Sequence, residues 1–281
     1  MQEVKISILT ATARDLGMLG YQIELLNLQT FRDFEWIFVD DRYPALDFSA
    51  AQFPVTYMAP VEIKSYYAPA VALNDGIARS RGELLYFMSD YIIPHADCLR
   101  AHWDIYQRYS RAMISGRCWE LNITPDEFMQ PNKAFHYNDY RLSLFENSYF
   151  KWDRLENSLY RSERSGVQNW WTGRNDSCPM EAMLECNGMD EQTDGGRGYV
   201  DDDMAQRLVI LGLEYLITLD ALCFQFPHQL EGGKPKLRTD EEQHQLFKVG
   251  VIQERMKKKI YKANPHRDLR VEREVWLKSR S

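Results

Sequence analysis

Cysteine is scarce and unpatterned in this chain of 281 residues, which contains five cysteines and no CxxC pair. They are Cys98, Cys118, Cys178, Cys186 and Cys223. An odd and scattered set excludes a disulfide framework, and the missing CxxC spacing argues against a zinc site. We therefore expect buried free thiols in a reducing compartment.

Long hydrophobic runs are also lacking. No segment approaches the roughly 20 apolar residues that a helix needs to span a bilayer. Met1 to Ile8 has no basic region followed by an apolar stretch, so it is not typical of a signal peptide. These features predict a cytoplasmic protein without a transmembrane segment.

An excess of positive charge is missing as well, because the net charge is -7. Such a chain has no general attraction to nucleic acid, and a nucleic-acid partner would need a local basic patch. Basic residues do gather near the C-terminus: Lys257, Lys258, Lys259, Lys262, His266, Arg267, Arg270 and Arg273. They suit peripheral contact with a membrane or a polyanion, or a solvated helix face with interspersed acids.

Short apolar runs that alternate with helical spacing are what the sequence does contain. The expected strands are Val4 to Leu9, Trp36 to Val39, Pro54 to Met58, Leu84 to Met88 and Tyr215 to Phe226. The expected helices are Leu16 to Leu28, Leu73 to Ala78, Asp97 to Arg108, Pro179 to Cys186 and Asp202 to Leu211. This alternation predicts an α/β fold with a mostly parallel sheet flanked by helices. Acidic and hydroxyl residues recur just after the strands, where open α/β sheets bind ligands.

Two further regions complete the expected organisation. Residues 119–171 are rich in aromatic and charged side chains and should form a partly helical insert, since a structureless loop of that length is improbable. Residues 232–281 have helical spacing and should pack back as a C-terminal helical extension. We therefore expect one domain over residues 1–231, with a nucleotide-binding half (1–118) and an acceptor-side half (119–231).

The first hundred residues carry a family resemblance. The segments ISILTATARD, LLNLQTFRDFEWIFVDDRY and ALNDGIARSRGELLYFMSDYIIPHADCL resemble glycosyltransferase family 2, whose members have a Rossmann-like GT-A fold. The resemblance implies a nucleotide-sugar donor, UDP-linked, with Thr10 and Asp41 at the base. A carboxylate at a strand end binds an imide N–H strongly in a partly dry cleft, although Asp40 and Asp41 can equally end a strand and start a turn. The other donor-binding residues implied are Ala11, Thr12, Arg14, Asp40, Asn74, Ser89 and Asp90.

The expected metal site is incomplete. The family carries paired acids where this chain reads Ser89-Asp90-Tyr91, so one carboxylate remains. His228, in CFQFPHQ, is placed like the C-terminal metal-binding histidine of many GT-A enzymes. Asp90 and His228, completed by diphosphate oxygens and water, would suit Mn²⁺ or Mg²⁺. A single histidine otherwise more often has no ligand role.

The segment GRGYVDDDMAQRL resembles the acidic acceptor-side motif of β-1,4-galactosyltransferases, with Val200 in place of its first glutamate. By that alignment Asp201 is the general base of an inverting transfer to a hydroxyl acceptor, and Asp202 belongs to the same catalytic cluster. Neighbouring carboxylates raise proton affinity, whereas a helix N-terminus lowers it. The alternative is that residues 201–203 only cap the helix that follows.

The resemblance places acceptor or donor contacts at Trp170, Trp171, Gly173, Asn187 and Gly188. Adjacent tryptophans point to opposite sides of an extended chain, so one of the pair should pack in the core. A glycan is the default acceptor, and a hydroxylated nucleic-acid base is an alternative. A catalytically inactive nucleotide-sugar or glycan-binding module is the rival from another class. A nucleotidyltransferase is disfavoured because no glycine precedes Gly17 after the first strand.

Overall fold

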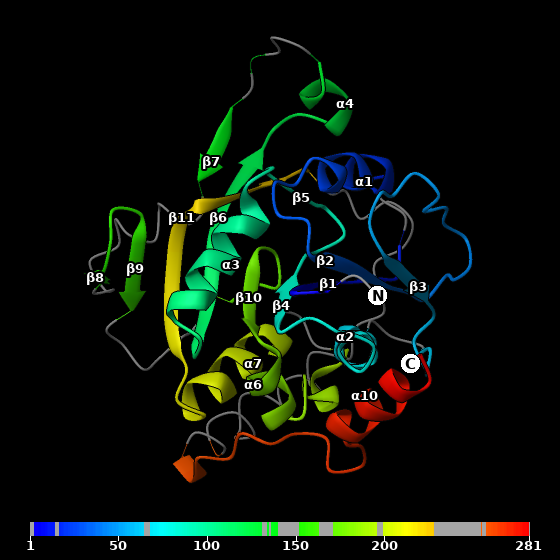
Figure 1. The fold of residues 1–281 in the computed structure, drawn as a ribbon, viewed down its shortest axis with the longest axis vertical. Helices are drawn as coiled ribbons and strands as arrows, with labels where there is room; N and C mark the ends of the chain where they lie inside the picture. The colour runs from blue at the N-terminus through cyan, green and yellow to red at the C-terminus, as the bar shows by residue number, and fades with distance from the viewer. Residues whose placement is uncertain are drawn as a thin grey trace.

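The computed structural model describes residues 3–14, 17–64, 68–130, 134, 136–139, 152–162, 171–195, 199–227, 254 and 257–280. One mixed sheet organises them, with strands in the order β3-β2-β1-β4-β10-β6-β11-β9-β8, while β5 pairs with β11 and β7 with β6 (Figure 1). The strands are β1 (Ile6–Thr12), β2 (Phe34–Asp40), β3 (Val55–Met58), β4 (Leu84–Phe87), β5 (Ile92–Pro94), β6 (Ala112–Leu121), β7 (Tyr137–Asp139), β8 (Trp152–Arg154), β9 (Leu159–Ser162), β10 (Asp176–Pro179) and β11 (Glu214–Gln225).

The direction of the strands explains where a site can form. β3, β2, β1 and β4 are mutually parallel. β10 runs antiparallel to both β4 and β6, so β6 runs in the same direction as β4, and β11 is parallel to β6. The carboxyl ends of β1, β4, β6 and β11 therefore meet at one edge of the sheet.

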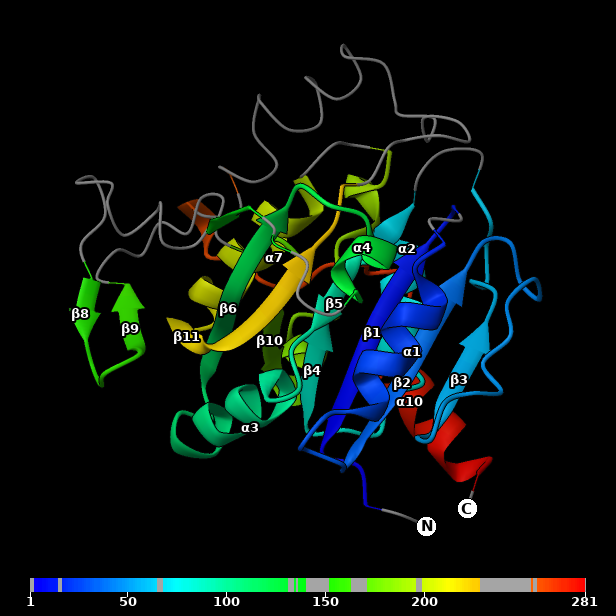
Figure 2. The ribbon, with the colours of Figure 1, turned by 90° about the horizontal axis from the view of Figure 1, so that it is seen from above.

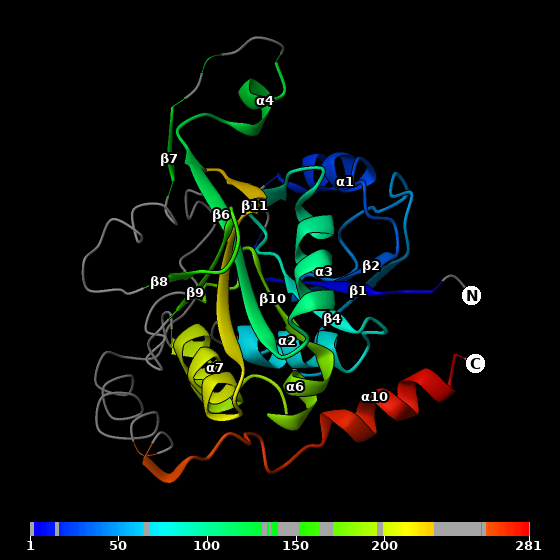
Figure 3. The same ribbon diagram turned by 60° about the vertical axis from the view of Figure 1, so that its left-hand side comes forward.

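Helices cover both faces of this sheet (Figure 2). They are α1 (Leu19–Asn27), α2 (Pro69–Ile77), α3 (Cys98–Arg108), α4 (Pro125–Phe128), α6 (Met180–Glu185), α7 (Tyr199–Ile210) and α10 (Leu269–Lys278), with a 3₁₀ turn η1 (Glu191–Thr193). α1 and α3 lie on one face, while α2, α6, α7 and α10 lie on the other (Figure 3). Among the helices in the described ranges, none has the length and apolarity to cross a bilayer.

Successive side chains of the central strands point to opposite faces of the sheet, so each strand contributes to a hydrophobic cluster on either face. Ile8 and Tyr86 pack with Ile23 of α1 and Leu99 of α3. Their strand neighbours, such as Leu9 and Phe87, pack on the opposite face with α2, α6 and α7. The strands β1, β2 and β4 are thus buried on both faces, which is why they appear in the sequence as continuous apolar runs.

The predicted α/β fold with helices on both faces is confirmed, and the expected strands and helices lie within a few residues of their predicted positions. The described part of the aromatic insert differs from the helical expectation. It contains the short helix α4 and three short strands, β7, β8 and β9, which extend the sheet. In the expected C-terminal extension (232–281), residues 232–253, 255 and 256 fall outside the described residues, and α10 is the tail helix that the structure describes.

Candidate functional site

A pocket opens at the carboxyl ends of β1 and β4, beside the first turn of α7. It is lined by Leu9, Ala11, Arg14, Pro69, Leu73, Phe87, Met88, Ser89, Asp90, Tyr91, Thr172, Gly173, Met189, Val200 and Asp201. Six of these were predicted from the sequence: Ala11, Arg14, Ser89, Asp90, Gly173 and Asp201. The lining comes from residues 9–91 and from residues 172–201, so both predicted halves of the domain contribute to the pocket.

Asp201 faces this pocket from the first turn of α7 and is partly exposed. Burial, followed by the nearby carboxylates of Asp176 and Asp202, raises the pKa of Asp201 to about 7, while Arg174 acts in the opposite direction. Loss of water and the crowding of carboxylates are thus the causes that raise the proton affinity of Asp201. A carboxylate with a pKa near neutrality can both accept and release a proton at physiological pH.

A tight turn, Thr172 to Arg174, forms the wall beside Asp201. Gly173 adopts φ +62°, and a Cβ there would lie 3.3 Å from the Oδ1 atom of Asp201, so glycine fits both the backbone and the space. The Ser89 hydroxyl donates to the carbonyl of Gly173 at 3.0 Å. On its inner side the turn donates two backbone N–H groups to Asp176.

Asp90 lies across the pocket and is already bound by three donors. The Thr12 hydroxyl donates to Oδ2 at 2.7 Å, and the Arg14 guanidinium donates to both carboxylate oxygens at 3.1 Å. Within the described ranges no group of three or more His, Cys, Asp or Glu side chains could hold a metal ion. The expected cation site needs His228 as well as Asp90, and His228 lies outside the described residues.

A smaller pocket adjoins the first one and shares Ala11 and Pro69 with it. Its other lining residues are Thr12, Ala13, Asp41, Ala68 and Ala72. Burial, and next to it the carboxylate of Asp40, raises the pKa of Asp41. Asp41 thus lies just after the end of β2 in a shallow pocket whose other side chains are mostly small.

Two predicted nucleotide-binding residues have their side chains engaged elsewhere. The Thr10 hydroxyl is buried, donates to the carbonyl of Met88 at 2.8 Å and accepts from the indole N–H of Trp36 at 3.0 Å. The fully buried Asp40 accepts from the backbone N–H and the guanidinium of Arg42. Asp40 therefore ends its strand and fixes the following turn, which is the alternative that the sequence allowed.

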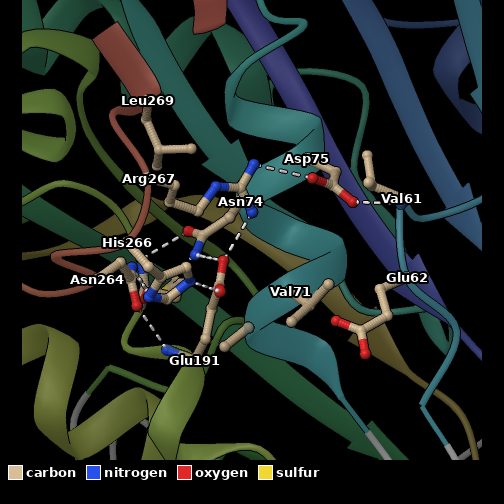
Figure 4. Close-up of polar contacts among 12 residues, drawn as sticks. Val61, Glu62, Val71, Asn74, Asp75, Glu191, Asn264, His266, Arg267 and Leu269 are labelled. Carbon is tan, nitrogen blue, oxygen red and sulfur yellow. Dashed lines mark hydrogen bonds and ion pairs between the residues drawn. The ribbon is translucent and has the colours of Figure 1, made fainter. Parts of the chain in front are cut away.

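Asn74, Asn187 and Gly188 are not among the residues that line the pocket. They lie at the attachment of the C-terminal segment, where Figure 4 shows Asn74 beside Glu191 and Arg267. The Asn74 amide donates to the carbonyl of Met189 at 2.9 Å and accepts from its N–H at 2.8 Å. Asn187 donates to the carbonyls of residues 263, 264 and 267, and accepts from the N–H of Leu269. Buried amides satisfied in this way have no free group for a ligand, which argues against the donor contact predicted for Asn74 and the substrate contact predicted for Asn187.

Gly188 has the same structural explanation. Its φ is +78°, and a Cβ would lie 2.2 Å from the side-chain oxygen of Asn74 and 2.3 Å from Leu269. Only glycine fits where α2 and the C-terminal segment come together. Its appearance beside Asn187 in an Asn-Gly pair therefore reflects packing.

Three predicted residues remain: Trp171 lies in the core, Asp202 lies on α7, and Trp170 is not described by the structure. Trp171 is 1% exposed and packs edge-on against Phe87, with ring centroids 5.3 Å apart, so it is the core member of the tryptophan pair. Trp170 lies outside the described residues. Asp202 is partly exposed in the first turn of α7 and is not among the residues that line the pocket.

Sequence patterns did not single out several residues that build the site. Tyr91, Thr172 and Met189 line the pocket. Asp176 raises the pKa of Asp201 and Arg174 lowers it. Their one common signal is proximity to a predicted strand end or to the motif around Asp201. Asp176 stands in DSCP, whose polar letters do not resemble a central strand, and only the fold brings it behind the pocket.

No protein-family model and no curated protein matches the sequence. Solved structures do resemble the fold. Staphylococcus aureus TarS 1–349 in complex with UDP-GlcNAc matches with a TM-score of 0.57 and 11% identity over 98% of this chain and 71% of that one. The same TarS fragment in complex with UDP gives a TM-score of 0.54 and 12% identity over 80% of this chain and 61% of that one.

The mannosyltransferase PcManGT from Pyrobaculum calidifontis, in complex with GDP-Man and Mn²⁺, matches with a TM-score of 0.55 and 13% identity. That match covers 82% of this chain, which spans 59% of the mannosyltransferase. At such identities the comparisons establish the fold alone. The chain has the GT-A fold of these glycosyltransferases.

Proposed function

We propose that this protein is a glycosyltransferase that moves a sugar from a nucleotide-sugar, UDP-linked, to a hydroxyl acceptor with inversion at the anomeric carbon. The observation that carries the proposal is the pocket in which Asp90 and Arg14 of the nucleotide-binding half face Asp201 of the acceptor-side half. It lies at the carboxyl edge of the sheet, where α/β folds bind their ligands. Structures of similar fold were determined with UDP, UDP-GlcNAc and GDP-Man.

Asp201 is the proposed general base. Its carboxylate accepts the proton of the acceptor hydroxyl while that oxygen forms a bond to the anomeric carbon from the face opposite the diphosphate. The bond between the anomeric carbon and the diphosphate oxygen breaks, and its electron pair leaves with the nucleoside diphosphate. The raised pKa of Asp201, about 7, supports this assignment because a base must hold the proton it removes.

The donor is proposed to lie along the carboxyl ends of β1 and β4. Asp41 in the adjoining pocket would accept the imide N–H of uracil. Arg14, which now pairs with Asp90, would bring positive charge to the diphosphate side. A guanidinium can bind phosphate oxygens through two parallel hydrogen bonds, so it suits this position.

Mn²⁺ or Mg²⁺ held by Asp90 and His228 belongs to the proposal as well, supported by the Mn²⁺ of the mannosyltransferase structure. When bound, such a cation would offset the negative charge on the leaving diphosphate. Because Asp90 is paired with Arg14, a cation could bind there only after Arg14 releases that carboxylate. The other ligands would have to come from outside the described residues or from the donor.

The experiment is a donor screen in which UDP-GlcNAc, UDP-glucose, UDP-galactose and GDP-mannose are incubated with the protein, with Mn²⁺ or with EDTA. Free nucleoside diphosphate is measured, with simple glycans and hydroxymethylated DNA as acceptors. Asp201→Asn should lower turnover by about 10²- to 10⁴-fold, the range for a lost general base, while UDP affinity stays within twofold. Binding of a nucleotide-sugar without turnover in any combination would identify an inactive module instead.

Asp202→Asn is the matched control, because it removes the neighbouring carboxylate on the same helix turn. Asp202 does not line the pocket, so its loss should lower turnover far less than the loss of Asp201. The reverse ranking would move the base to Asp202. Equal and small effects from both variants would leave the helix-capping interpretation of residues 201–203 in force.

A further inference from the structure

Asp176 is a buried acid that the proposed chemistry does not use. It is the first residue of β10 and is fully buried between β4 and β6. Burying a carboxylate is costly unless hydrogen bonds satisfy it. Its position directly behind the wall of the pocket calls for an explanation.

The contacts of Asp176 tie the core of the sheet to that wall. Its Oδ2 accepts from the N–H of Thr172 at 2.9 Å, from the Thr172 hydroxyl at 3.3 Å and from the N–H of Arg174 at 3.4 Å. Its Oδ1 accepts from the Ser115 hydroxyl, and Ser115 accepts from the Tyr215 hydroxyl at 2.8 Å. The carboxylate thus fixes the turn on one side and is anchored in β6 and β11 on the other.

The turn held in this way is the one that touches Asp201. Gly173, between the two residues that donate to Asp176, comes so close to Asp201 that a Cβ would lie 3.3 Å from Oδ1. The carboxylates of Asp176 and Asp201 therefore lie on opposite sides of one short turn. We propose that Asp176 is a positioning residue for Asp201, which fixes the turn beside it and makes it a stronger base by placing a second negative charge behind it.

This inference rests on the proposed function, since it names a residue that serves the same base. Several charged or titratable groups face Asp201 from the elements around it: Asp176 of β10, Asp202 of α7, Arg174 of the turn, and Tyr91, Asp90 and Arg14 across the pocket. After burial, Asp176 makes the largest contribution to the raised pKa of Asp201, ahead of Asp202. It therefore acts through charge as well as through hydrogen bonds.

The test is Asp176→Asn, which removes the charge and keeps the shape. The side-chain oxygen of asparagine can still accept from the turn, while its NH₂ group can donate to Ser115. In protein labelled with ¹³C at the aspartate carboxylates, the Asp201 signal, assigned with Asp201→Asn, should titrate about one pH unit lower than in the wild type. If the protein turns over a donor, its activity at pH 6 relative to pH 8 should rise about fivefold, because more Asp201 is ionised.

Ser115→Ala is the matched control, since it removes one hydrogen bond to Asp176 and leaves the charge. Its Asp201 titration should not move to lower pH. Equal shifts in Asp176→Asn and Ser115→Ala, or no shift in Asp176→Asn, would overturn the proposal, because a structural effect alone would then account for the data. If the asparagine variant does not fold, Asp176→Ser carries the same expectation. The titration decides the matter even when the wild type lacks transferase activity, so the two proposals fail separately.

Discussion

Replacing Asp201 with asparagine should stabilise the folded protein in alkaline solution, in addition to removing the proposed base. The pKa of Asp201 is raised in the folded state from its ordinary 3.8 to about 7. The folded protein therefore holds this proton more tightly than the unfolded chain, and ionisation of Asp201 opposes folding. The penalty is absent below about pH 4, grows as the pH rises and is complete above about pH 7.

The size of the effect follows from the shift. A rise of about three pH units in the pKa of Asp201 corresponds to a loss of at most about 4 kcal/mol in the free energy of unfolding, at about 1.4 kcal/mol per unit. Asp201 is partly exposed to the pocket, where water screens its charge, so about 1–2 kcal/mol is expected. For a chain of this size that raises the Tm at pH 8.5 by about 2–6 °C.

Thermal unfolding of the wild type and Asp201→Asn, measured by circular dichroism from pH 4.5 to pH 8.5, gives the comparison. The gain in Tm should appear between pH 5 and pH 7.5 and reach a plateau above it. Glu24→Gln, at an exposed position on α1, is the control for removing one negative charge and should show no such pH step. A Tm gain that does not depend on pH, or a loss at pH 8.5, would refute the idea that Asp201 is held in a costly ionised state.

Two further predictions concern Arg14 and Arg267. If a cation binds Asp90, Arg14→Ala should tighten Mn²⁺ binding several-fold in calorimetry without nucleotide, because it removes the competing guanidinium; unchanged affinity would count against Asp90 as a ligand. Arg267→Ala should lower the free energy of unfolding by about 3 kcal/mol in urea, because Arg267 pairs with the buried Asp75. Arg270→Ala, which breaks an exposed pair, should cost less than about 1 kcal/mol, and equal losses would contradict the special role of Arg267.

The parts of the fold that sequence patterns predicted are those whose signal is local. β1, β2 and β4 are apolar because both of their faces are covered, and α7 carries a run of acids in its first turn. β10 was missed because its polar side chains Asp176 and Ser177 are satisfied by partners far along the chain, and the longer β6 was not predicted either. The burial of Asp176 depends on hydrogen bonds to partners such as Ser115, which a short stretch of sequence around Asp176 does not include.

The candidate site divides in the same way. Asp41 and Asp201 follow recognisable segments, and both lie in pockets. Asn187 belongs to an equally recognisable Asn-Gly pair, yet its amide holds the C-terminal segment. A sequence motif shows which residue type occupies a position, and it does not tell whether that residue packs within the protein or contacts a substrate.

The attachment of the C-terminal segment also sets the timing of folding. Arg267 is synthesised 192 residues after its partner Asp75, which at ribosomal speed is a delay of about 10–40 s. Asn264, which holds the carbonyl of Met189 at the edge of the pocket, arrives equally late. The strands β1, β2 and β4 can therefore pair while the chain is still growing, whereas the part of the pocket wall that contains Met189 is held in place only after residues 264–267 have been made. A nascent chain would form the strand-end side of the pocket before its opposite wall is fixed.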